Sequence, residues 1–230
     1  MREMETGRDA LATSRVRVGA AIRAKRQASG LSLADLANRV GVALSTMSKI
    51  ENGRISTSFE RLEAVGRALD ADMAEFVGVG GQVAVATSAS PLSSERPAYG
   101  TRRSITRAED GRMVDAGTYL EWFHAADMLH KRFQPIVAEI LLTDIADYGA
   151  FTQHSGEEFN YVLEGELEFH CEAYAPVRLT AGSSIYFDAE MKHAHIKVGD
   201  APCRILGILC PRAEPAAGAP RLRVVPANQA

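Results

Sequence analysis

The sequence predicts two domains of different class, a small all-α domain followed by an antiparallel β-domain. Three observations lead to this division. Short amphipathic segments with closely spaced Gly and Asn-Gly stops occupy residues 14–77. A stretch rich in Gly, Ser, Ala and Pro, without periodicity, follows at 78–104 and is typical of a linker. Short β-rich runs separated by Gly, Pro and acidic turns fill residues 105–210.

Five short helices are expected in the first domain, because apolar residues recur there at helical spacing and then stop. We place them at residues 16–28, 33–40, 45–51, 59–69 and 73–77. Ser32 and Ser58 are expected as the N-caps of the second and fourth helices. The first 13 residues, which precede the apolar pattern, are expected to form a flexible N-terminus.

Five strands are recognisable in the second domain, and more are expected between them. The β-rich runs cover residues 136–142, 159–163, 167–171, 184–187 and 203–209. Several short strands at this spacing predict an antiparallel sandwich or barrel. The Ala/Pro-rich stretch 211–230 is expected to be a loose C-terminal tail. The fold class is therefore multidomain, α plus β.

Charge is divided unevenly between the two domains. Residues 14–61 contain nine Lys or Arg against three acidic residues, a balance of +6, although the whole chain carries −3. Residues 105–210 contain eight basic and seventeen acidic residues, a balance of −9. The basic part is therefore expected to meet a polyanion, and the acidic part to have another task.

The composition excludes collagen-like, fully disordered and membrane-spanning classes, with 46% hydrophobic and 24% charged residues. No apolar run approaches the roughly 18–20 residues of a spanning helix. The first nine residues are too charged for a secretory signal, so we expect a cytoplasmic protein without a membrane partner. The three cysteines, Cys171, Cys203 and Cys210, lack CxxC spacing and are expected to be buried spectators.

The third predicted helix has the polar and apolar faces of a helix that reads DNA. Met47 and Ile50 face the core, whereas the other face is polar. The second and third helices are joined by a tight turn, which lets the second of the pair lie in the major groove while the first crosses the backbone. Glu51 is expected to brace the domain by pairing with a neighbouring Arg rather than to face phosphate.

The stretch GLSLADLANRVGVALSTMSKIENGRISTSFERLEAVGRALD resembles the Xre/Cro repressor family, whose helix-turn-helix domain has the lambda-repressor-like fold of five helices. Its run SKIENG is similar to the family's S-x-I-E-x-G signature, and the resemblance covers about residues 16–77. The family often has Gln at the position of Leu33, which cannot make that hydrogen bond to DNA. The resemblance implies base-edge contacts from Leu44, Ser45 and Ser48, and phosphate contacts from Thr46, Lys49, Asn52 and Arg54.

His154, Glu158 and His193 form a candidate metal site in the second domain. His154 and Glu158 are four residues apart, so alternation along one strand would send both to the same face, and His193 would arrive on another strand. Two imidazoles and one carboxylate are a suitable donor set for iron(II) or another divalent transition ion. Asn160 is two residues after Glu158, and His195 is two residues after His193, so alternation would point both side chains inward to line the same cavity.

The same residues resemble the cupin family, a β-barrel of jelly-roll topology, over about residues 118–210. The family's motifs His-x3-Glu-x6-Gly and Gly-x10-His are matched at residues 154–165 and 182–193. The first motif normally begins with a further His, where this chain has Thr152, so a four-ligand site is not expected. The pocket residues that we expect are Trp122, His154, Glu158, Asn160, His193 and His195.

Three alternatives remain open for the barrel. It holds a divalent metal such as Fe, Zn, Mn or Ni on three ligands, it binds an organic ligand without a metal, or it is purely structural. No cofactor follows with certainty from the residues. Carboxylates are in excess near the motifs, which favours a cationic ligand such as an amine, although alternation places several of them outside the barrel.

The order helix-turn-helix, linker, cupin resembles a large group of bacterial transcriptional regulators in which the cupin dimerises and senses a small molecule. The resemblance implies a sequence-specific regulator, in our prediction a repressor, that binds a palindromic operator in double-stranded DNA as a homodimer and responds to an effector. The alternative is an enzyme, because the same order and triad resemble hydroxypropylphosphonate epoxidase, a mononuclear non-heme iron oxidase. The +6 balance of the helical part argues against an enzyme. A cupin that only dimerises is the third interpretation.

Overall fold

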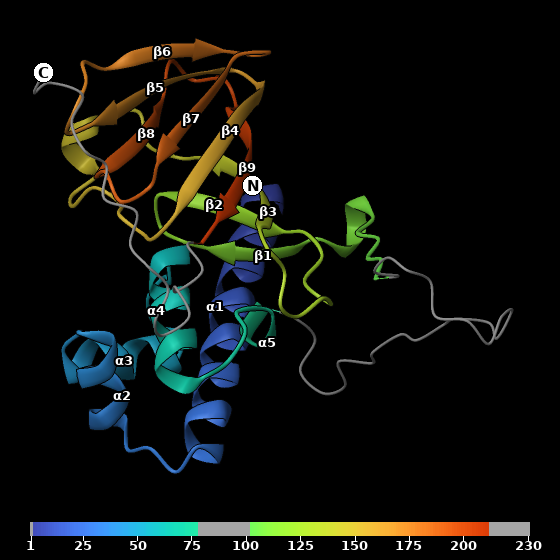
Figure 1. The fold of residues 1–230 in the computed structure, drawn as a ribbon. Coiled ribbons are helices and arrows are strands. Elements are labelled where there is room, and N and C mark those ends of the chain that lie inside the picture. Colours follow the sequence, from blue (N-terminus) through green and yellow to red (C-terminus); the bar gives the residue numbers. More distant parts are fainter. Residues whose placement is uncertain (1, 78–101, 212–230) are drawn as a thin grey trace, which may run out of the picture.

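The computed structural model describes residues 2–77 and 102–211, which form a helical domain and a β-domain packed against each other (Figure 1). The helices are α1 (Arg2–Ala28), α2 (Leu33–Val40), α3 (Leu44–Glu51), α4 (Phe59–Leu69) and α5 (Ala74–Val77). The sequence places α2, α3, α4 and α5 within a residue of these bounds. The predicted linker, apart from 102–104, and the tail beyond Pro211 lie outside the described residues.

Capping explains where α2 begins and ends. The hydroxyl of Ser32 accepts a hydrogen bond from the Asp35 N–H, and the Asp35 carboxylate accepts one from the Ser32 N–H, which is a capping box. Gly41 ends the helix in the left-handed region at φ 75°. Ser58 occupies the N-cap position of α4 as predicted, but its side chain makes no capping hydrogen bond.

The prediction of a flexible N-terminus at residues 1–13 is wrong for residues 2–13, because α1 begins at Arg2. These residues include Glu, Met, Ala and Arg and no Pro, so their helix propensity is high although they lack the apolar periodicity on which the prediction relied. Within the described residues, no helix combines the length and the apolar character that crossing a membrane requires.

The β-domain consists of two antiparallel sheets. Its strands are β1 (Arg112–Asp115), β2 (Tyr119–Phe123), β3 (Gln134–Ile140), β4 (Glu157–Glu164), β5 (Glu166–Cys171), β6 (Val177–Thr180), β7 (Ser184–Asp188), β8 (His193–Lys197) and β9 (Arg204–Cys210). The larger sheet has the order β1-β2-β3-β9-β4-β7, and the smaller has the order β6-β5-β8. This confirms the antiparallel β-fold, and side chains from both sheets meet inside it, such as Phe169 and Phe187, whose ring centroids are 4.9 Å apart.

The hydrophobic core continues from the helical domain into the β-domain. Phe59, the first residue of α4, is buried and stacks on Phe123 of β2 with ring centroids 6.5 Å apart. Polar contacts surround this point: the Thr57 N–H donates to the carbonyl of Asp115 over 3.2 Å, and the Ser56 hydroxyl donates to the Asp115 carboxylate over 3.1 Å. The start of α4 therefore lies over the open end of the β-domain (Figure 1).

Candidate functional site

Helix α3 presents one face to the core and the other to solvent. Met47 and Ile50 are fully buried, and this fixes the helix against the rest of the domain. Leu44 is 52% exposed. The remaining predicted DNA contacts are exposed or half-buried: Ser45, Thr46, Ser48, Lys49, Asn52 and Arg54. The structure thus groups these seven residues on and directly after α3, while their role in DNA binding stays a prediction.

Glu51 belongs to the core, as its expected bracing role requires. Its two carboxylate oxygens accept hydrogen bonds from Nε and Nη2 of Arg26 over 2.6 and 2.9 Å. The hydrogen bond with Glu51 raises the pKa of the Arg26 guanidinium. Because Arg26 also donates to the carbonyl of Leu31 over 2.8 Å, this pair ties α1 to α3 and to the loop before α2.

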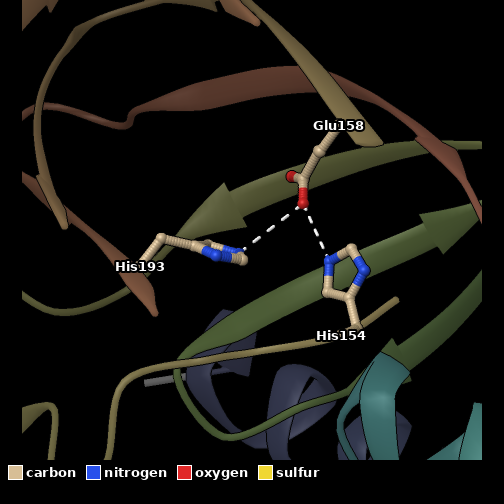
Figure 2. A group of neighbouring side chains, drawn as sticks. All are labelled: His154, Glu158 and His193. Atoms are coloured by element: carbon tan, nitrogen blue, oxygen red, sulfur yellow. Dashed lines mark hydrogen bonds and ion pairs between the residues drawn. The ribbon is translucent and has the colours of Figure 1, made fainter. Parts of the chain in front are cut away.

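The three candidate metal ligands converge inside the β-domain (Figure 2). Nε2 of His154 lies 2.9 Å from Oε2 of Glu158, and Nε2 of His193 lies 3.6 Å from the same oxygen. The candidate ligand atoms all lie within 4.8 Å of one another, and all three residues are buried. The prediction that strand alternation brings His154 and Glu158 together is wrong, because His154 lies in the loop before β4 and not on the strand.

The second ring nitrogen of each histidine is turned toward a backbone carbonyl. Nδ1 of His193 is 2.8 Å from the carbonyl oxygen of Met191, and Nδ1 of His154 is 3.4 Å from that of Ser155. A carbonyl oxygen only accepts, so Nδ1 of each ring is placed to carry a proton, as is common among metal-ligating histidines. Nε2 of His154 donates to the Glu158 carboxylate, and a metal that replaced this proton would find Nε2 of both rings on the side of Glu158. The residues present therefore fit a divalent transition metal held by three protein ligands.

Electrostatics in the triad are dominated by burial and by the one carboxylate. Burial alone would raise the pKa of Glu158, but the hydrogen bond from His154 and the charge of His193 lower it to about 2. Burial lowers the pKa of His154, but its hydrogen bond with Glu158 and the charges of Glu158 and Glu60 together outweigh burial, so the pKa is raised. Burial prevails at His193, whose pKa is lowered. The carboxylate is thus held in its ionised form, ready for a cation.

A cavity of about 40 Å³ adjoins the triad. It is lined by Phe59, Glu60, Tyr119, Glu121, Ile136, Ala138, Thr152, His154, Glu158, Asn160, His193, His195, Ile205, Gly207 and Leu209. Five of the six predicted pocket residues are among them. Phe59 and Glu60 come from α4, so the helical domain closes one side of the cavity.

Trp122 is the pocket prediction that the structure contradicts. It does not line the cavity. Side chains alternate along β2, so the inward positions are Tyr119, Glu121 and Phe123, and Trp122 points to the other face. The same alternation could have identified Glu121, which the sequence reasoning missed. Phe59 and Glu60 carried no such signal, because they reach the pocket from another domain.

His195 anchors a chain of hydrogen bonds at the back of the pocket. Its Nε2 is 3.1 Å from the side-chain nitrogen of Asn160, and its Nδ1 is 3.1 Å from the hydroxyl of Tyr119. Burial lowers the pKa of His195 to about 4, so the ring is neutral and accepts from the Asn160 amide. The chain continues from Tyr119 to Tyr148 over 2.6 Å and from Tyr148 to Thr152 over 3.1 Å.

Thr152 stands where the cupin motif has its first histidine. It faces His193 in an isolated antiparallel bridge, in which each backbone N–H donates to the other residue's carbonyl over 2.8 and 2.9 Å. Its hydroxyl is engaged with Tyr148, and it lines the cavity. The backbone position of a fourth ligand is therefore present, but its side chain is not an imidazole.

Two domain families match the chain, and no curated protein matches it. Residues 17–76 match the helix-turn-helix domain family, and residues 146–209 match the cupin domain family. These matches fall on α1 to α5 and on the β-domain that holds the triad.

Solved structures also resemble the chain. The crystal structure of an HTH_3 family transcriptional regulator from Vibrio cholerae is 20% identical and covers 87% of this chain and 99% of its own, with a TM-score of 0.51. Hydroxypropylphosphonic acid epoxidase from S. wedmorenis is 16% identical, covering 85% and 97%, with a TM-score of 0.42. The same enzyme with fosfomycin is 18% identical, covering 85% and 98%, with a TM-score of 0.40. Together the two family matches and the folds described above show that the chain joins a helix-turn-helix domain to a cupin domain.

Proposed function

We propose that this protein is a DNA-binding transcriptional regulator whose cupin pocket senses a small molecule. The observation that carries the proposal is α3, whose apolar residues Met47 and Ile50 are fully buried while its polar residues face solvent. Glu51 is the exception, since it is buried and paired with Arg26, and Leu44 is exposed. An outer face made of Leu44, Ser45 and Lys49 suits a helix that enters the major groove. The charge balance of +6 over residues 14–61 and the fold shared with the Vibrio cholerae transcriptional regulator support the same function.

The regulator is proposed to act as a homodimer on a palindromic operator, in which the two half-sites lie about one helical turn, roughly 34 Å, apart. Effector binding changes operator affinity if it stabilises one relative position of the two helix-turn-helix domains of the dimer over another. The contacts of α4 with the pocket support this coupling, because the same helix belongs to the helical domain and lines the cavity. We propose that the unliganded protein represses and that the effector releases it.

DNA binding is tested by fluorescence anisotropy with the DNA upstream of the protein's own gene, across a series of salt concentrations. We expect affinity to fall steeply with salt, with a slope of about 0.9 per phosphate contact. Lys49→Ala and Arg54→Ala are each expected to weaken binding and to reduce the slope by about one contact. Arg178→Ala is the control, because Arg178 is an exposed cation of the cupin domain. Equal behaviour of the three variants would contradict the assignment of α3.

We further propose that His154, Glu158 and His193 hold a divalent transition metal. The donor set and the two Nδ1–carbonyl contacts support it. Metal content of the purified full chain, measured by mass spectrometry after loading with Fe(II), Zn(II), Mn(II) or Ni(II), is expected near one per chain. Glu158→Gln removes the anionic ligand of the triad and is expected to abolish loading, whereas Glu157→Gln, on the opposite face of β4, is expected to retain it.

A second candidate function is a mononuclear non-heme iron oxidase, and the triad is the observation that favours it. When iron is bound, it would supply the oxidising chemistry, and the residues of this chain would bind and orient the substrate. Oxygen uptake by iron-loaded protein with a reductant present, abolished in Glu158→Gln, would favour the enzyme. Salt-dependent operator binding without oxygen uptake would favour the regulator.

A further inference from the structure

Two buried acceptor atoms of the pocket have no hydrogen-bond partner among the described residues. They are Oε2 of Glu121 and Oδ1 of Asn160. The side chains belong to β2 and β4, and the residues are 7% and 1% exposed. The amide nitrogen of Asn160 already faces His195, so the amide oxygen is the atom left to accept a hydrogen bond from a ligand. Buried acceptors are normally satisfied, and these two indicate a molecule that brings hydrogen-bond donors into the cavity.

Glycine at position 207 leaves room beside one of these acceptors. A Cβ at Gly207 would lie 3.2 Å from Oδ1 of Asn160, closer than most real Cβ contacts. Gly207 itself lines the cavity. Any larger residue at this position on β9 would press on the acceptor that has no partner, so the backbone of β9 keeps the approach to Asn160 open.

The pocket is lined by acidic side chains. Three carboxylates line it, those of Glu60, Glu121 and Glu158, and none of the described lining residues is Lys or Arg. Burial, together with the charges of Glu60 and Glu158, raises the pKa of Glu121 well above its ordinary value. The empty pocket therefore favours the neutral form of Glu121, and a positive group in the cavity would lower its pKa and favour the charged form.

A metal on the triad would leave the acceptor atoms of Glu121 and Asn160 without a partner. The cluster of possible metal ligands among the described residues contains Glu158 but not Glu121 or Glu60. Glu168 of β5, by contrast, has its partner outside the pocket, since it accepts from Arg178 over 3.1 Å. Glu121 and Glu60 are therefore the carboxylates that a second, organic cation would meet.

We propose that the pocket binds a small organic cation, a protonated amine, whose N–H groups donate to Glu121 and Asn160 and whose charge lies beside Glu60. The proposal rests on the proposed function, for which it names the class of effector. A cavity of about 40 Å³ accepts a group of only a few atoms while α4 stays in place. Phe59 and Glu60 of α4 line the cavity, so a longer amine that reaches them would link its binding to the position of the helical domain.

The test measures binding of ethylammonium chloride to the full chain by thermal shift and by titration calorimetry, at constant ionic strength set with NaCl. Propionate and propanamide, of similar size, are the anionic and neutral probes. We expect a saturable rise in melting temperature with ethylammonium alone. Because the probe has only three non-hydrogen atoms, its dissociation constant is expected on the order of millimolar. No saturable binding of ethylammonium, or an equal response to propionate, overturns the proposal.

Matched variants locate the site. Glu121→Gln and Glu60→Gln keep the side-chain shape and are each expected to weaken ethylammonium binding about tenfold or more, because a hydrogen-bonded charge is lost. Glu157→Gln, on the outer face of β4, is expected to bind as the unmodified chain does. Unchanged affinity in Glu121→Gln overturns the proposal even if the cation binds elsewhere.

The same samples separate this proposal from the proposed function. Salt-dependent operator binding in a chain that takes up no cation overturns the ligand class and leaves the regulator standing. Cation binding that depends on Glu121, in a chain that binds no DNA, supports the ligand class and removes the regulator. Cation binding that changes operator affinity supports both.

Discussion

Replacing Glu51 by Ala should destabilise the helical domain more than any surface change on the same helix. The substitution leaves the Arg26 guanidinium, whose side chain is 11% exposed, with the Leu31 carbonyl as its acceptor. Removing one partner of a buried ion pair costs about 3–5 kcal/mol, because the other charge stays buried without compensation. Arg26 retains some contact with water, so we expect about 3 kcal/mol, a large part of the roughly 5–15 kcal/mol that stabilises a domain.

The assay is urea unfolding followed by circular dichroism at 222 nm, which reports on α1 to α5. Lys49→Ala is the control, since Lys49 is exposed on the same helix and its loss should change stability by no more than about 0.5 kcal/mol. The double variant Arg26→Met with Glu51→Leu removes both charges and should recover much of the loss, because no unpaired ion remains. A loss below about 1 kcal/mol in Glu51→Ala, or a double variant less stable than Glu51→Ala, would refute the reasoning.

Three further predictions use the same unfolding assay or simple labelling. Gly19→Ala should lose about 1–3 kcal/mol although Ala favours helices, because its Cβ would overlap the backbone carbonyl oxygen of Ile50. Equal or higher stability in urea would contradict this packing. Burial raises the pKa of Cys203 to about 11, so its thiol stays protonated at pH 8 and iodoacetamide should label Cys171 well before it, as peptide mass spectrometry can show. Unfolding followed by the fluorescence of the single tryptophan, Trp122, should coincide with the loss of helical signal in the unmodified chain and separate from it in Phe59→Ala.

Local signals made most of the fold predictable. The bounds of α2 follow from a capping box at its start and a left-handed glycine at its end, and both signals lie within a short stretch of the sequence. Two family motifs identified His154, Glu158 and His193, although His154 reaches the site from a loop that parity cannot place. Residues 2–13 were missed as helix because their propensity is not accompanied by an apolar pattern.

What the sequence could not supply is contact between domains. Glu60 lies on a helix of the basic domain, and nothing in its neighbourhood along the chain relates it to a pocket on β2, β4 and β8. Glu121 was accessible in principle, since it alternates with Tyr119 and Phe123, but attention to aromatic residues led to Trp122 instead. A site that two domains complete together becomes visible only when their packing is known.

The stacking of Phe59 on Phe123 also limits how this protein can be taken apart. If the helical domain were expressed alone, or fused to a cupin from another protein, the ring of Phe59 would lose the surface that now buries it. The cupin in turn would lose the helix that covers its open end. Chimaeras that exchange reader and sensor must therefore carry the start of α4 together with its matching surface on β2, or expose an aromatic patch that favours aggregation.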